Sequence, residues 1–263
     1  MLECVVNVSE GRDEFVLNAL RAAAGGTLLD LHADPHHNRA VLTLAGPDVE
    51  EAAQTVAAEG VRRIDLGRHH GVHPRLGAVD VVPFAPLERS TIADAVAARD
   101  RFAAWAAAQL GLPCFLYGPE RSLPDVRRLA FSSLAPDTGS PEPHPSAGVI
   151  CVGARPVLIA YNVALTDPVA ADVAIAMRGT AVRALGLDAG DGSTQVSMNL
   201  LDWRKVGPAQ AYDQVARLAE RAGAKVAGAE LVGLLPAAAL EAVPNDRWHE
   251  LGLSSEKTIE SRL

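Results

Sequence analysis

The sequence predicts an α+β protein built from two ferredoxin-like subdomains, each with the order βαββαβ, packed side by side with a cleft between them. Two observations lead to this prediction. In the first half, short strand-like apolar stretches and longer stretches with helical spacing follow the order strand, helix, strand, strand, helix, strand. The second half repeats this order without repeating the sequence. Because small-molecule sites favour such junctions, we expect the functional site in the cleft.

The first subdomain is expected to span residues 1–147. Gly25 and Gly26 end its first helix, because glycine favours helix ends. Pro and Gly punctuate chains strongly, so a run of prolines up to Ser146 marks irregular chain and a boundary. Strands are expected at 3–8, 27–32, 38–44, 76–84 and 113–117, helices around 16–23, 49–64 and 91–110, and the prolines are Pro119, Pro124, Pro136, Pro141, Pro143 and Pro145.

The second subdomain is expected to span residues 148–263. Apolar runs predict its strands, and apolar residues at helical spacing predict its helices. The chain from residue 236 onward is expected to form short helices and a polar tail. Strands are expected at 149–152, 157–165, 195–201 and 226–234, and helices at 169–184 and 209–222.

Composition and charge limit the classes of function. The 263 residues are 49% hydrophobic and 21% charged, which is typical of a globular protein. The net charge of -8 and the scattered Lys and Arg argue against a nucleic-acid surface. No apolar segment is long enough to cross a membrane and the chain does not open like a signal peptide, so we expect no membrane partner and a cytoplasmic location. Cys4, Cys114 and Cys151 lie far apart in apolar runs, which indicates buried, reduced thiols.

The stretch 65–84, DLGRHHGVHPRLGAVDVVPF, carries the densest group of chemically active side chains. Gly71 and Pro74 exclude a helix and favour an extended His73. In the strand that follows, Val79 and Val81 are expected on one face. Asp80, Val82 and Phe84 are expected on the other face.

Asp80 would then lie on an otherwise apolar face, where a carboxylate needs a partner, and we expect His73 or Arg75 to supply it. A histidine beside a carboxylate can take and return a proton near neutral pH, so His73 is a candidate acid/base. The alternative is that these histidines only cap backbone groups of a polar loop.

The histidines at 36, 37, 69, 70 and 73 also suggest a metal site. Adjacent histidines on an extended segment point apart, and no carboxylate or thiol stands beside them at a spacing typical of metal ligands. We therefore predict that no metal binds here.

The stretch RHHGVHPRLGAVDV at 68–81 resembles the active-site segment of the formiminotransferases, which runs RHKGEHPR before GALDV. Four further motifs resemble this family in the same order: NVSEG at 7–11, FLYG ending at residue 118, GARPVLIAYNVAL from residue 153 and QVSMNLLD from residue 195. The resemblance implies the two-subdomain fold, a homodimer and small-molecule substrates. It also implies transfer of the formimino group from N-formimino-L-glutamate to tetrahydrofolate, a co-substrate, giving 5-formiminotetrahydrofolate and L-glutamate.

The same resemblance implies roles for individual residues. His73 matches the family's catalytic acid/base, Arg75 would lie beside an anionic substrate group, and Asp80 would orient one of the two. Because the substrates are anionic, a local positive pocket is expected, with Arg39, Arg68, Arg75 and Arg155 as candidates. The residues expected to bind glutamate or folate are Asn7, Asn38, Arg39, Arg68, Asn162, Gln195, Ser197 and Asn199.

Two of these assignments have structural alternatives. Gln195, Ser197 and Asn199 alternate with apolar residues, so they form either a polar wall of the site or a solvated sheet face. Asn162 lies in an apolar run and needs hydrogen-bond partners, which a purely structural role would also provide.

The chain departs from the family at several positions. His70 and Val72 replace a lysine and a glutamate, His32 replaces an aspartate and Pro156 replaces a lysine. The connection 184–194 is short where the family has a longer basic segment. These departures leave two alternatives open: a related enzyme that acts on a formyl group or 5-formyltetrahydrofolate, or a non-catalytic relative that binds a folate or an amino-acid derivative.

Overall fold

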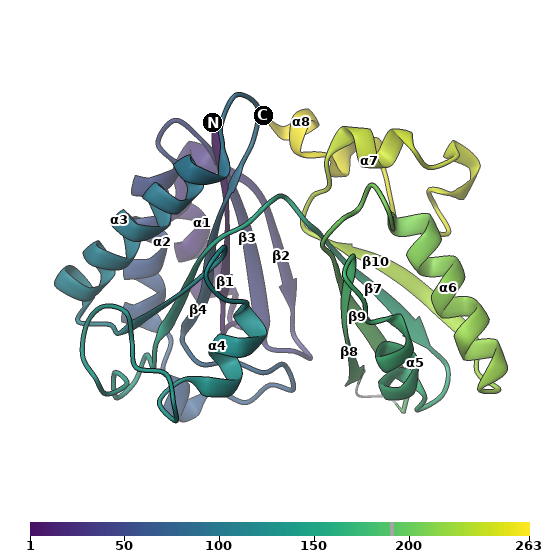
Figure 1. Ribbon diagram of the computed structural model, residues 1–263, viewed down its shortest axis with the longest axis horizontal. Helices are drawn as coiled ribbons and strands as arrows, with labels where there is room; N and C mark the ends of the chain where they lie inside the picture. The colour runs from purple at the N-terminus through teal and green to yellow at the C-terminus, as the bar shows by residue number, and fades with distance from the viewer. Residues whose placement is uncertain (190–191) are drawn as a thin grey trace. The chain divides into compact units, whose positions relative to one another are not determined.

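The computed structural model describes residues 1–189 and 192–263, which form two compact units, Met1–Pro156 and Val157–Leu263. Each unit contains one βαββαβ motif, as the sequence predicts (Figure 1). The first motif consists of β1 (Leu2–Val8), α1 (Glu14–Ala24), β2 (Leu28–Asp34), β3 (Arg39–Gly46), α2 (Val49–Arg63) and β4 (Val79–Pro86).

The first unit contains more than this motif. Its sheet has the order β2-β3-β1-β4-β6-β5, in which the first four strands pair antiparallel and β6 pairs parallel with both β4 and β5. The helix α3 connects β4 to β5, two strands of the same direction that have β6 between them. The added elements are α3 (Ile92–Leu110), β5 (Cys114–Tyr117), α4 (Leu123–Leu129) and β6 (Ile150–Ala154).

The main core of the first unit lies between the sheet and the helices α1, α2 and α3. These helices bury apolar faces that include Leu17, Leu20 and Phe102, and the strands contribute Leu42 and Phe84. Good caps fix the helix ends: the side chain of Asp13 caps α1, and Thr91 and Asp94 form a capping box at α3.

The second face of this sheet is partly covered by α4. Val126 of α4 packs in a small cluster with Phe115, Tyr117 and Cys151. Part of the first unit therefore has helices on both faces, because its parallel strands must be buried on both sides.

The second unit repeats the motif with an all-antiparallel sheet of order β10-β7-β9-β8. The helices α5 and α6 cover one face of this sheet, and Tyr161, whose hydroxyl donates to the carbonyl of Leu251, lies in that core. The elements are β7 (Ile159–Leu165), α5 (Ala170–Met177), β8 (Val182–Asp188), β9 (Thr194–Leu200), α6 (Pro208–Arg221), β10 (Val226–Val232), α7 (Ala237–Glu241) and α8 (Ile259–Arg262).

Two expected elements are wrong. The strand expected at 149–152 is β6, which belongs to the first sheet, so the first unit continues to Pro156 and does not end at residue 147. The helix expected at 169–184 ends at Met177, because Arg178 is extended and Gly179 follows it. Residues 182–188 form β8, while residues 190 and 191 of the connection 184–194 lie outside the described residues.

The three cysteines are buried and unpaired, as expected. Burial raises the pKa of Cys114 and of Cys151 to about 12, so both remain protonated and unreactive at neutral pH. No helix in the described part of the chain is both long and apolar enough to span a membrane.

Candidate active site

Three loops of the first unit meet at one end of its sheet. They are residues 9–12 after β1, residues 35–38 between β2 and β3, and residues 69–75 before β4. Asn38 joins all three: its Oδ1 accepts from the Gly11 amide at 2.9 Å, its Nδ2 donates to the His70 carbonyl at 3.1 Å, and its own carbonyl accepts from His69 Nε2 at 2.8 Å. Its φ of 47° is one that asparagine tolerates. The side chain of this expected binding residue is therefore occupied by loop backbone.

Glycines allow these loops to approach closely. A Cβ atom on Gly71 would lie 2.3 Å from the carbonyl oxygen of His37, and one on Gly11 would lie 2.4 Å from that of Asp34. No real side chain fits at such distances. The glycines of the HHGVHPR and NVSEG motifs are thus required by the packing of the loops.

A β-bulge places Asp80 at this end of the sheet. Where β1 pairs with β4, Asn7 lies opposite Val81 and Val8 lies opposite Val79, so Asp80 is the extra residue. Bulges shift the facing of side chains and are frequent beside functional sites.

The bulge changes the alternation that we expected in β4. Val79 lies with Val82 and Phe84 in the main core, while Val81 lies in the small cluster under α4. The prediction that Val79 shares a face with Val81, and Asp80 with Val82 and Phe84, is therefore wrong, because it assumed an unbroken strand.

Asp80 is fully buried at the centre of an ion cluster. Its Oδ2 accepts from Arg39 Nη1 at 2.8 Å and from Arg127 Nη2 at 2.5 Å, and its Oδ1 accepts from the Leu76 amide at 2.7 Å. The second terminal nitrogen of Arg39 donates to Asn7 Oδ1 at 2.9 Å. Burial alone would raise the pKa of Asp80, but the two guanidinium charges and the hydrogen bonds lower it to about 2. Two arginines and one carboxylate leave the cluster with a net positive charge.

Arg127 was not among the expected site residues, because the proline-rich stretch after β5 was expected to be irregular chain. Arg127 lies on α4, and its Nη1 also donates to the carbonyl of Pro74 at 3.2 Å. The signal for this helix was present: Ser122 caps it, Pro124 stands in its first turn, and Asp125 binds the Ser122 hydroxyl.

His73 lies beside this cluster and is half-buried. Its pKa falls to about 3, mainly because burial disfavours the imidazolium and then because Arg39 and Arg127 repel it. The carbonyl of Pro74 and the charge of Asp80 act in the opposite direction. The imidazole is therefore neutral at neutral pH.

The contact of His73 with Pro74 fixes which ring nitrogen carries the proton. Nδ1 lies 2.8 Å from the Pro74 carbonyl oxygen, which can only accept a hydrogen bond. Nδ1 therefore donates, and Nε2 carries the lone pair of the neutral ring. This is the arrangement of a general base that acts through Nε2.

Arg75 binds backbone carbonyls of its own loop and does not bind Asp80. Its Nη1 donates to the carbonyls of Gly71 at 3.0 Å and His73 at 3.2 Å, and its Nη2 donates to that of His69 at 3.1 Å. The expected contact of Asp80 with His73 or Arg75 is thus replaced by its contacts with arginines from β3 and α4. Arg75 braces the loop that carries His73.

The other expected basic residues are more exposed. The side chain of Arg68 is 89% exposed, and its Nε lies 3.7 Å from Asp65 Oδ2. This guanidinium is therefore accessible to an incoming ligand. Arg155 donates to the carbonyl of Pro156 at 3.0 Å and is not tied to the ion cluster by a hydrogen bond.

The remaining expected residues lie in the second unit. Asn162 on β7 pairs with Ser197 on β9, and Gln195 and Asn199 stand two positions to either side. All four lie on the sheet face opposite the core, as the alternation predicts. Asn162 Nδ2 lies 3.4 Å from a carboxylate oxygen of Glu230, so this buried amide has a partner within the sheet.

The histidines of the loops bind separate partners. His69 Nε2 contacts the Asn38 carbonyl, His37 Nδ1 contacts Asp34, and His73 Nδ1 contacts Pro74. Among the residues that the structure describes, no group of three or more His, Cys, Asp or Glu side chains could hold a metal ion.

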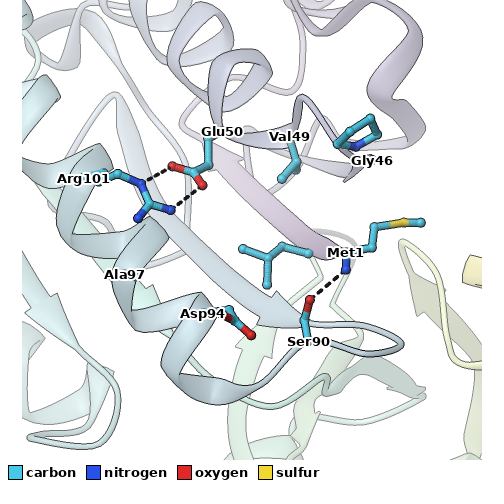
Figure 2. A pocket seen from close by; sticks show the side chains of 10 residues that line it. Met1, Gly46, Val49, Glu50, Ser90, Asp94, Ala97 and Arg101 are labelled. Atoms are coloured by element: carbon cyan, nitrogen blue, oxygen red, sulfur yellow. Dashed lines mark hydrogen bonds and ion pairs between the residues drawn. The ribbon is translucent and has the colours of Figure 1, made fainter.

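A surface hollow of about 320 Å³ lies at the other end of the same strands (Figure 2). Leu2 and Gly46, which pair there, belong to its lining. Polar groups of its lining bind within the first unit: Glu50 forms two hydrogen bonds with Arg101, at 2.7 and 2.9 Å, and the amino group of Met1 donates to the Ser90 hydroxyl at 2.7 Å. The hollow is therefore separate from the loops that carry His73.

The chain has two βαββαβ units, and the first carries a histidine beside a buried Asp–Arg cluster. These features define a class of two-subdomain α+β proteins. Residues 1–155 match the formiminotransferase domain, N-terminal subdomain, and residues 160–246 match the formiminotransferase domain. The chain belongs to the formiminotransferase family.

Relatives from distant organisms support this assignment. The chain is 38% identical over 270 residues to the glutamate formimidoyltransferase of Streptococcus pyogenes serotype M1, covering 91% of this chain and 90% of that protein. It is 33% identical over 271 residues to the glutamate formimidoyltransferase of Thermoplasma acidophilum, covering 91% and 89%. It is 35% identical over 275 residues to the formimidoyltransferase-cyclodeaminase of Sus scrofa, covering 91% of this chain but only 51% of that protein.

Proposed function

We propose that this protein transfers the formimino group of N-formimino-L-glutamate to tetrahydrofolate, giving 5-formiminotetrahydrofolate and L-glutamate. The observation that carries the proposal is the neutral His73, whose Nε2 has its lone pair free beside the ion cluster of Asp80, Arg39 and Arg127. The relatives named glutamate formimidoyltransferase support the choice of reaction.

The reaction needs one proton to move between two nitrogens. The N5 amine of tetrahydrofolate attacks the formimino carbon, a C–N bond forms, and His73 Nε2 accepts the proton that the attacking nitrogen loses. The tetrahedral intermediate then collapses, the bond from the carbon to the glutamate nitrogen breaks, and His73 returns the proton to that nitrogen. A positioned acid/base contributes about 10²- to 10⁴-fold to such a rate.

The ion cluster adapts His73 to an anionic donor. With no substrate bound, Arg39 and Arg127 hold the pKa of His73 low, which makes it a weak base. A substrate carboxylate near these arginines offsets their charge and so raises the pKa of His73 toward the range useful for catalysis. The positive cluster thus attracts the donor and also couples its binding to the activation of the base.

The other expected residues take three kinds of role in this proposal. Arg68, which is exposed, contacts anionic groups of the substrates. Asn7, Asn38 and Arg75 hold Arg39 and the loops in place. The polar strip of Asn162, Gln195, Ser197 and Asn199 contacts the folate or the glutamate portion. A homodimer and a cytoplasmic location remain predictions.

The departures from the family motif alter the surroundings of His73 and not the base itself. His70 and Val72 are both exposed on the loop, and the side chains that bind the backbone there belong to His69 and Arg75. These substitutions therefore change the charge that a substrate meets on approach.

Turnover of formiminoglutamate with tetrahydrofolate, measured by the appearance of the folate product, tests the proposal. We expect His73→Ala to lower kcat at least 100-fold, and His249→Ala, at an exposed histidine of the second unit, to leave it unchanged. Near-normal turnover by His73→Ala would contradict the proposed base. Preference for formylglutamate or 5-formyltetrahydrofolate would favour the formyl alternative, and folate binding without turnover would favour a non-catalytic relative.

A further inference from the structure

A second histidine packs against His73. The ring of His37, at the tip of the β2–β3 hairpin, lies 6.1 Å from the ring of His73, centroid to centroid, and the two planes meet at 71°. This is the edge-to-face geometry that aromatic rings favour. His37 is only 8% exposed, so its ring is a fixed part of the wall on which His73 rests.

Asp34 holds His37 in this orientation through two hydrogen bonds to His37 and one to the backbone of His36. Its Oδ1 accepts from the amides of His36 and His37 at 2.8 and 2.9 Å, and its Oδ2 lies 2.7 Å from His37 Nδ1. The same contacts, which outweigh the effect of burial, lower the pKa of Asp34 to about 2, so its carboxylate is ionised and Nδ1 is the donor. The backbone and the ring of the hairpin tip are thus fixed by one side chain.

The other ring nitrogen of His37, Nε2, does not help to hold the hairpin tip. This atom is buried, and the described residues offer it no hydrogen-bond partner. Buried polar atoms are normally paired, so a histidine with an unpaired ring nitrogen lowers the stability of the fold. The packing of this ring against His73 gives a reason for a histidine at this position.

His73 has few other restraints of its own. Within the described part of the chain, the hydrogen bond of its ring joins Nδ1 to the carbonyl of the next residue, Pro74, and this contact leaves the ring able to tilt about the Nδ1···O axis. The charged groups near it, Arg39, Arg127 and Asp80, act on its charge state. A packed neighbour is what can fix its plane.

We propose that His37, anchored by Asp34, is a positioning residue that holds the ring of His73 edge to face, so that Nε2 points at the reacting nitrogens. This inference rests on the proposed transfer reaction. The ring of His37, and not its hydrogen bonds, would fix the orientation of His73. The Nδ1 hydrogen bond holds the hairpin tip, and Nε2 has no partner among the described residues.

Two substitutions separate the ring from the nitrogens. We expect His37→Ala to lower kcat about tenfold with KM within twofold, because substrate binding does not need the orientation of His73. We expect His37→Phe, which keeps a ring of similar width, to restore most of that loss. Asp30→Asn, which removes a carboxylate from β2, is the control with unchanged kcat. A His37→Phe enzyme as slow as His37→Ala would overturn the inference.

A second measurement needs no turnover. In 15N-histidine-labelled protein without substrates, the line widths and shifts of the His73 ring signals report whether the plane of the ring is fixed. We expect His37→Ala to broaden these signals, because the ring then tilts about the Nδ1···O axis, and His37→Phe to keep the wild-type pattern. A wild-type pattern in folded His37→Ala protein would show that His37 does not position His73. If the wild type transfers no formimino group but this spectrum changes as expected, the proposed function fails and the positioning role stands.

Discussion

Arg39 and Asp80 form an ion pair across an intervening strand. Arg39 Nη1 at the start of β3 donates at 2.8 Å to Asp80 Oδ2 in the bulge of β4, and β1 lies between these two strands. Asn7 of β1 accepts from the same guanidinium, so the pair is bridged by the strand that it crosses. The sheet is thereby fixed at the end where the His73 loop begins.

We predict that Asp80→Asn lowers the free energy of unfolding by about 3–5 kcal/mol, since removing one partner of a buried ion pair leaves the others uncompensated. Arg39 and Arg127 would then face each other across a neutral group. Urea denaturation measures the loss, with Asp30→Asn as a control that stays within about 0.5 kcal/mol of wild type. An Asp80→Asn variant as stable as this control would show that the cluster contributes little to folding.

Hydrophobic periodicity was enough to predict the first βαββαβ motif, because each of its strands and helices carries its own pattern. It misassigned β6, whose partners β4 and β5 are non-local and parallel, so no turn signal in the sequence pointed to them. It also merged β8 with the helix before it, because the short apolar runs on both sides of Gly179 suit either structure.

The sequence singled out His73 and Asp80 as candidate site residues and did not predict the side chains that bind Asp80. The apolar face expected for Asp80 required an opposite charge. The arginines that supply it lie 41 residues before and 47 residues after Asp80 in the chain. Tertiary folding and a bulge bring them together, and neither leaves a local pattern that alternation can reveal.

The low pKa of His73 predicts a loss of stability in mild acid. The folded-state pKa is about 3 and the ordinary value is 6.5, so between these values the unfolded chain binds more protons. The free energy of unfolding must therefore fall as the pH drops from 6.5 toward 3. We expect denaturation curves of His73→Ala to show a flatter decline over this window, while His249→Ala keeps the wild-type slope. Equal slopes in all three proteins would mean that His73 titrates normally.

Arg127 and Arg128 are neighbours on α4 with opposite surroundings. Arg127 binds Asp80 and the Pro74 carbonyl, whereas the side chain of Arg128 is 66% exposed and pairs with Asp125 of the same helix. We predict that Arg127→Ala lowers kcat/KM at least tenfold, because it releases the loop carrying His73 and removes positive charge from the site.

The matched substitution Arg128→Ala should change kcat/KM less than twofold and the free energy of unfolding by less than about 1 kcal/mol, as is usual for a surface ion pair. Steady-state kinetics on both variants makes the comparison. If the two substitutions have the same effect, α4 contributes only general charge, and the specific contact of Arg127 with Asp80 has no role in the site.

Gly71 lies in tight contact with the loop of the β2–β3 hairpin. A methyl group there would lie 2.3 Å from the His37 carbonyl and 3.0 Å from Cβ of Asn38, so Gly71→Ala must push the two loops apart. We predict a loss of at least tenfold in kcat, since His73 moves with its loop. Gly179→Ala, with nothing within 4 Å of the new methyl, is the control that should keep wild-type kcat. An active Gly71→Ala enzyme would show that the loop tolerates displacement and that the positions of His37 and His73 are not strictly coupled.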